Sequence, residues 1–203
     1  MTLPHSSRLR EFALDGVRGG AVLALAVVLL GLAALGEAPR LALRWDRAAL
    51  AGGEAWRLVS GHFVHLDLGH AALNVLGMVL VWMLFARAFS ARQWLLIVGA
   101  GIAAIDAGLW FVNAGLDWYV GASGVLHAAM AAGIVRRMIG RDLLAWGLGV
   151  AGAAKLLYEH FSGAMPLMGS GALVVTDAHL YGALAGMICG VALRDRAQGV
   201  AGG

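Results

Sequence analysis

Gly121-Ala122-Ser123-Gly124 places a serine among small residues at the start of an apolar stretch, residues 120–138. Later in the chain, Ala178-His179-Leu180-Tyr181-Gly182 places a histidine in a second apolar segment with spaced glycines. A serine hydroxyl is a weak nucleophile until a neighbouring base takes its proton, and histidine is a common base. Polar side chains are costly inside a bilayer and usually mark function there. The two segments therefore predict a serine–histidine pair that can perform acyl transfer.

The composition predicts an all-α membrane protein. The chain has 203 residues, of which 61% are hydrophobic and 13% charged, and its mean hydropathy is +0.80. A soluble domain carries about 25% charged residues. Each of six apolar stretches approaches the ~20 residues that a helix needs to cross a bilayer: 19–36, 65–86, 93–115, 120–138, 143–161 and 176–193. We expect a bundle of six transmembrane helices over residues 19–193, between a leader (1–18) and a tail (194–203).

The basic residues predict the topology of this bundle. If the N-terminus is cytoplasmic, 10 of the 15 basic residues fall on the cytoplasmic side, 4 on the outer side, and Lys155 within a span. This bias follows the positive-inside rule and places both termini in the cytoplasm. The net charge of +3 is then explained by topology, and no nucleic-acid partner is expected. Fourteen arginines against one lysine indicate a GC-rich bacterial genome, hence an inner membrane.

Glycine predicts which helices approach closely. Gly182, Gly186 and Gly190 recur every fourth residue in the last apolar stretch, which leaves a smooth stripe for a neighbouring helix. Gly121 and Gly124 flank Ser123 in the fourth stretch. Contact between these two helices would bring Ser123 within hydrogen-bond reach of His179. The alternative is that such glycines serve ordinary membrane packing.

Further polar residues are candidates for the same site. His65, His70 and Asn74 open the second stretch, and the last two share a helix face because they are four residues apart. An imidazole and a carboxamide can both donate to a developing oxyanion. His127 follows Ser123 by four residues, and helical side chains lean toward the N-terminus. The spacing therefore leaves two candidate bases, His127 and His179.

Two other classes of function compete with acyl transfer. The seven histidines include no H-E-x-x-H motif and no thiolate cluster accompanies them, so no metal and no cofactor is predicted, although haem bound by a pair of histidines remains an alternative. Four charged residues lie in or near the apolar stretches and would suit a proton-coupled transporter: Asp67, Asp106, Lys155 and Glu159. Lys155 and Glu159 are four residues apart and could simply pair with each other.

Four motifs in this order resemble the rhomboid family of intramembrane serine proteases. They are Trp56-Arg57, the His65-x4-His70-x3-Asn74 pattern, Gly121-Ala122-Ser123-Gly124, and Ala178-His179-x2-Gly182-x3-Gly186. The resemblance implies a rhomboid-like bundle in which Ser123 is the nucleophile and His179 the base, with no third acid. It also implies an oxyanion hole formed by His70, Asn74 and the Ser123 backbone N–H. The fifth span would then be the lateral gate for substrate.

One departure points to a branch of that family. The family usually has an aromatic residue four positions after the serine, whereas this chain has His127. The continuation Gly124-Val125-Leu126-His127, with the short chain, is similar to the rhombosortase branch. That resemblance implies membrane-anchored exported proteins as substrates, each ending in a Gly-Gly motif, an apolar span and a basic cluster. A general rhomboid protease with other single-span substrates is the alternative.

Overall fold

The structure is a computed structural model that describes residues 16–163 and 175–193. Three parts of the sequence lie outside the described residues: most of the leader (1–15), the segment 164–174, and the tail (194–203).

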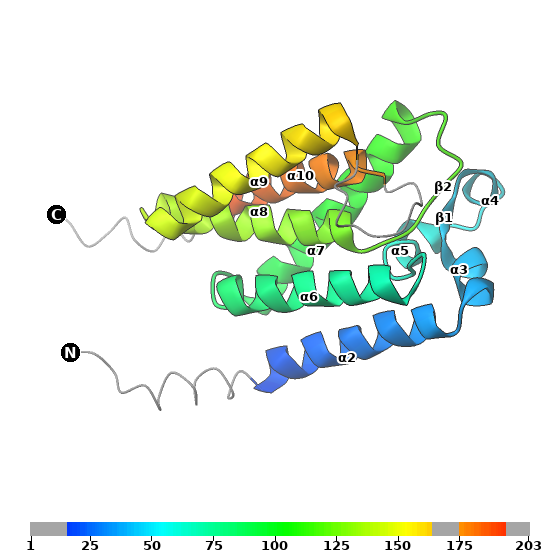
Figure 1. Cartoon of the computed structure of the whole chain (residues 1–203), viewed down its shortest axis with the longest axis horizontal. Helices are drawn as coiled ribbons and strands as arrows, with labels where there is room; N and C mark the ends of the chain where they lie inside the picture. The colour runs from blue at the N-terminus through cyan, green and yellow to red at the C-terminus, as the bar shows by residue number, and fades with distance from the viewer. Residues whose placement is uncertain (1–15, 164–174, 194–203) are drawn as a thin grey trace.

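One long helix forms in each of the six apolar stretches. These helices are α2 (Gly16–Ala34), α6 (Leu68–Phe85), α7 (Ala91–Ala107), α8 (Ser123–Ile139), α9 (Leu143–Ser162) and α10 (Asp177–Ala192). A short π-helical turn, η1 (Gly108–Val112), continues α7. Figure 1 shows that the start of α2 and the end of α10 lie at the same end of the bundle, while the start of α8 lies at the opposite end. The mostly helical class is confirmed.

Fewer of the described helices than the six apolar stretches are long and apolar enough to cross a membrane. Of the described helices, two are long and apolar enough to cross a membrane, Leu68–Phe85 and Ala91–Val112. A third counts if the bent pair α2 and α3 (Glu37–Leu43) is one span. By contrast, α8 and α10 have 17 and 16 residues, short of the ~20 that span a bilayer. The longer α9 carries Lys155 and Glu159.

The segment 37–61, which connects the first two apolar stretches, is folded. It contains α3, α4 (Arg47–Ala51), α5 (Arg57–Ser60) and the strand β1 (Trp45–Asp46). β1 pairs antiparallel with β2 (Trp118–Tyr119), so the described chain is not purely helical. The buried Arg57 donates from Nη1 to the carbonyl oxygens of Leu41 and Arg44, both at 2.9 Å. Guanidinium groups supply several donors at once, which lets this irregular segment satisfy its carbonyls.

The closest helix contact is between α8 and α10. A Cβ added at Gly182 would overlap the carbonyl of Gly124, and one at Gly186 would overlap the carbonyl of Ala128. A Cβ at Gly190 would lie 2.8 Å from the carbonyl oxygen of Ala132. The glycine stripe of α10 thus rests directly on the backbone of α8, as small residues allow in membrane bundles.

This contact yields the first prediction. Gly186→Ala should destabilise the bundle by about 1–3 kcal/mol, because overpacking forces α8 and α10 apart. Gly99→Ala is the matched control, since a Cβ at this glycine of α7 meets nothing within 4 Å. Thermal unfolding in detergent measures both variants. Equal melting temperatures for the two would show that the α8–α10 contact does not depend on glycine.

Candidate active site

Ser123 is the first residue of α8, and the turn before it is tightly constrained. Gly121 has a φ of +120°, a backbone conformation that strongly favours glycine. A Cβ there would also lie 3.0 Å from Cε1 of His70. The Gly121 carbonyl accepts a hydrogen bond from the Tyr119 hydroxyl at 2.7 Å, and its N–H donates to Gly61 O at 3.1 Å. The G-x-S-G turn therefore has one well-defined position against the rest of the molecule.

The serine hydroxyl lies against the histidine of α10. Ser123 Oγ is 2.8 Å from His179 Nε2, and His179 is 1% exposed. Gly124 allows this distance, because a Cβ there would lie 2.8 Å from the carbonyl oxygen of Ala178. Two residues that are far apart in sequence thus form a hydroxyl–imidazole pair, with the imidazole buried and the hydroxyl half-buried.

His127, the other candidate base, has both ring nitrogens engaged elsewhere. Its Nδ1 is 2.7 Å from the Ser123 carbonyl oxygen, and its Nε2 is 3.1 Å from Lys155 Nζ. Because a carbonyl only accepts, Nδ1 carries the proton and Nε2 of the neutral ring accepts from the lysine. The His127 ring stacks on His179 with centroids 4.2 Å apart and 16° between the planes. His179, not His127, is the imidazole hydrogen-bonded to the serine hydroxyl.

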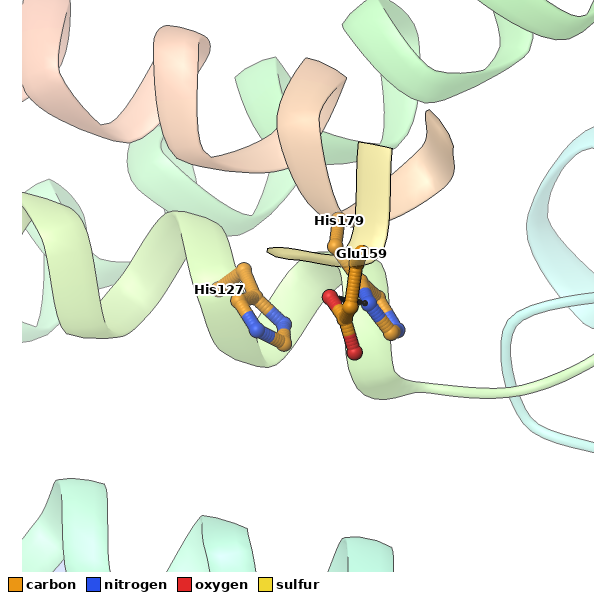
Figure 2. A group of neighbouring side chains, drawn as sticks. All are labelled: His127, Glu159 and His179. Atoms are coloured by element: carbon orange, nitrogen blue, oxygen red, sulfur yellow. Dashed lines mark hydrogen bonds and ion pairs between the residues drawn. The ribbon is translucent and has the colours of Figure 1, made fainter. Parts of the chain in front are cut away.

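A carboxylate also reaches this pair, whereas the resemblance implied no third acid. Glu159 Oε2 is 2.9 Å from His179 Nδ1, and both side chains are 1% exposed. Figure 2 shows the three side chains converging from α8, α9 and α10, with the Glu159 carboxylate beside His179. Lys155 Nζ lies 2.7 Å from the same Glu159 oxygen, so the expected pairing of these two residues is present. What the sequence did not indicate is that the pair faces the histidines.

Together these contacts close a ring of five hydrogen bonds. The ring runs from Ser123 Oγ through His179, Glu159, Lys155 and His127 back to the Ser123 carbonyl. With both imidazoles neutral, the ammonium and the carboxylate balance, so the ring has no net charge in an apolar bundle. His127, Glu159 and His179 offer ligand atoms within 4.8 Å of one another. The Lys155 ammonium already supplies a cation between two of them.

The remaining candidate residues divide between two cavities. His70 and Ser123 line a cavity of about 210 Å³, together with residues 115–120 of the connection between η1 and α8. His65 stands edge-on to His70 at 5.0 Å, and its Nε2 accepts from Ala122 N at 3.5 Å. Asn74 instead lines a larger apolar cleft of about 490 Å³ among α2, α6, α7 and α8. Its Nδ2 donates to the His70 carbonyl at 2.9 Å. Of the two side chains expected to donate to the oxyanion, His70 and Asn74, only His70 borders the cavity beside Ser123.

The charged residues considered for transport are also paired. Asp106 Oδ1 lies 3.2 Å from Nε2 of His62, which is 1% exposed. The His62 ring stands edge-on to Tyr119, the residue that anchors the Gly121 carbonyl. Asp67 caps α6 by accepting from His70 N at 2.7 Å. The Asp106 contact joins α7 to the serine turn through His62 and Tyr119, whereas Asp67 only caps its own helix. Local structure thus accounts for both charges.

Comparison with known proteins identifies the family. The model of the rhomboid domain matches residues 52–196, which is most of the chain. The chain therefore belongs to the rhomboid family, whose members are intramembrane serine proteases. No curated protein matches the chain significantly. The family supports an intramembrane protease that acts on membrane proteins.

Proposed function

We propose that this chain is an intramembrane serine endopeptidase in which Ser123 is the nucleophile and His179 the general base. The observation that carries the proposal is the 2.8 Å contact between Ser123 Oγ and His179 Nε2 inside a helical bundle of a rhomboid domain. A hydroxyl hydrogen-bonded to the free nitrogen of an imidazole is the arrangement that activates serine. The competing base, His127, has no nitrogen left to accept from that hydroxyl.

The reaction follows from these positions. Ser123 Oγ attacks the scissile carbonyl carbon while its proton passes to His179 Nε2. The same proton then passes to the leaving amine as the C–N bond breaks and an acyl-enzyme remains. A water molecule next attacks the ester and gives a proton to His179, which returns it to Ser123 Oγ as the acid product leaves. The 210 Å³ cavity beside Ser123 is the proposed entrance for that water.

Two donors are proposed to stabilise the oxyanion. The first is the backbone N–H of Ser123, because the first N–H groups of a helix have no partner within it and no side chain caps α8. The second is the imidazole of His70, which borders the same cavity. Asn74, the third donor that the resemblance implies, would first have to give up its bond to the His70 carbonyl.

We also propose six spans with both termini in the cytoplasm of a bacterial cell and the active site near the outer face. The ends of α2 and α10 that adjoin the termini lie together, and the α6–α7 and α8–α9 turns lie at that same end (Figure 1). Arginines mark those turns, as the positive-inside rule requires: Arg87, Arg92, Arg136, Arg137 and Arg141. At the serine end, Arg40, Arg44 and Arg57 each pair with a nearby carboxylate.

For substrate, we propose the rhombosortase class, namely exported proteins anchored by a C-terminal Gly-Gly motif, an apolar span and a basic cluster. The Leu126-His127 continuation of the serine motif supports this choice. A helical segment hides its carbonyls in its own hydrogen bonds, so a scissile bond must be unwound to reach Ser123. Each glycine in a helix is less favourable than an alanine by ~1 kcal/mol, so a helix unwinds more easily at glycine. A Gly-Gly pair at the outer boundary would therefore be extended easily.

The assignment of the base is tested by three variants. Ser123→Ala and His179→Ala should each lower the rate of substrate cleavage by about 10⁶-fold, the scale seen when either member of such a pair is removed. His127→Phe keeps a ring against His179 and should retain measurable cleavage. A fluorophosphonate probe, which labels an activated serine, provides the parallel readout. The assignment is wrong if His179→Ala is labelled normally while folded His127→Phe is not.

The oxyanion proposal predicts unequal effects of two neighbouring residues. His70→Ala should slow cleavage by about 10²–10³-fold, as loss of one donor does in similar sites. Asn74→Ala should slow it less, because Asn74 faces the other cavity and donates to the His70 carbonyl. Initial rates with one reporter substrate measure both. Full activity in His70→Ala, with a large loss in Asn74→Ala, would reverse the two roles.

The substrate proposal is tested by changing the tail of a co-expressed anchored protein. Replacing its Gly-Gly pair by Leu-Leu should block processing, since leucine keeps the segment helical. Immunoblotting of membrane and released fractions separates cut from uncut protein. A type I anchor without glycine serves as the control and should remain uncut. If both glycine-free proteins are processed as fast as the Gly-Gly form, the chain is a general rhomboid protease instead.

A further inference from the structure

Glu159 is the buried charge that the proposed mechanism leaves unused. Of the 20 residues of α9, all of which the structure describes, only Ala145 and Glu159 are buried. Ala145 lies near the start of the helix, so Glu159 is the buried residue at the end near Ser123. A carboxylate inside a membrane bundle is costly and usually has a specific partner. The question is whether its partner is the lysine or the catalytic histidine.

We infer that Glu159 is a positioning residue that orients His179 and balances its charge, so that the site works as a Ser123–His179–Glu159 triad. The inference rests on the proposed function, in which His179 is the base. An ionised carboxylate only accepts hydrogen bonds, so the His179 nitrogen 2.9 Å away, Nδ1, must carry the proton. In the neutral ring, Nε2 is then unprotonated and faces the Ser123 hydroxyl. This is the tautomer that the reaction requires.

Glu159 also faces the charge that the reaction creates. When Nε2 takes the serine proton, His179 becomes an imidazolium whose Nδ1–H still points at the carboxylate. Opposite charges in hydrogen-bond contact attract strongly where water is excluded. In serine hydrolases an acid in this position holds the imidazole in place and stabilises the imidazolium without taking its proton.

Lys155 and His127 hold this acid in position. Lys155 Nζ donates to Glu159 Oε2 at 2.7 Å and to His127 Nε2 at 3.1 Å. His127 is fixed in turn by the Ser123 carbonyl and by stacking on His179. The lysine side chain is 22% exposed whereas Glu159 is 1% exposed. The carboxylate therefore lies on the histidine side of the pair, which a simple lysine–glutamate pair on the surface of α9 would not require.

The acid comes from α9, whereas the nucleophile and the base come from α8 and α10. The C-terminal end of α9 contacts the described bundle through Glu159 and Lys155. It follows that the triad is complete only while this end of α9 is seated. A substrate that enters past α9 must either keep the Glu159–His179 contact intact or allow it to form again before cleavage.

Four variants separate positioning from simple charge pairing. Lys155→Met leaves the buried Glu159 carboxylate without its cation, and Glu159→Gln leaves the half-buried Lys155 ammonium without its anion. Both variants should therefore lower the melting temperature. The double variant removes both charges and should recover stability. The rate of Ser123 labelling by a fluorophosphonate should fall by about 10²–10⁴-fold in Glu159→Gln, as it does when the acid of a serine triad is lost. The labelling rate should stay equally low in the stable double variant. Glu159→Asp, which keeps a carboxylate, should restore part of that rate.

Cleavage kinetics of the double variant separate a positioning role from substrate binding. In the double variant kcat should fall while KM changes little, because Glu159 does not line the cavity beside Ser123. His160→Gln, at the exposed next position of α9, is the matched control and should leave the rate unchanged. Recovery of both stability and rate in the double variant would show that Glu159 only neutralises Lys155, and would overturn the inference.

The tautomer can be measured without any activity. In ¹⁵N-histidine spectra of the unreacted protein, His179 should have a protonated Nδ1 and an unprotonated Nε2, and Glu159→Gln should disturb that state. If wild-type Ser123 is not labelled but this tautomer is observed, the proposed function fails and the positioning role of Glu159 stands. An Nε2-protonated His179 in the wild type would overturn the inference directly.

Discussion

The backbone contact between α8 and α10 is the constraint on which the rest of the site depends. Gly182 and Gly186 lie so close to the carbonyls of α8 that any side chain would overlap them, and Gly124 meets the Ala178 carbonyl in the same way. This separation sets the 2.8 Å between Ser123 Oγ and His179 Nε2. It also allows His127 to stack on His179. A bundle with ordinary side chains along this seam would hold the two helices too far apart for these contacts.

Given that contact, the electrostatics explain why α9 carries two charges. In the proposed mechanism His179 becomes an imidazolium inside an apolar bundle, and an isolated buried charge there is strongly disfavoured. Glu159, which contacts both His179 and Lys155, is proposed to supply the compensating charge, and Lys155 to balance the carboxylate in the resting site. His127 completes the ring of hydrogen bonds in place of the aromatic residue usual at that position. One polar network within the described chain thus satisfies groups from α8, α9 and α10.

The sequence predicted the parts of this arrangement that are determined locally. The six long helices follow from apolar runs, and the approach of α8 to α10 follows from glycines at every fourth position. The sequence left His127 and His179 as alternative bases, because helical spacing allows either one. Only tertiary contacts determine which ring nitrogen meets the Ser123 hydroxyl. The acid was missed because the i, i+4 pairing of Lys155 and Glu159 was a sufficient explanation for both residues. Nothing in α9 alone indicates which of its faces meets the bundle, since the surrounding residues are apolar on all sides. The folding of segment 37–61 could not be predicted, because it depends on tertiary hydrogen bonds. Arg57 donates to carbonyls within the segment, and Arg47 donates to the carbonyls of Leu109 and Leu116.

The most direct test is an experimental structure of the protein after reaction with a fluorophosphonate. The account predicts phosphorus bonded to Ser123 Oγ, with the His179 ring beside it and Glu159 on Nδ1 of that ring. An adduct on another side chain would contradict the account. So would an unmodified Ser123 in a folded bundle, or a Glu159 carboxylate turned away from His179.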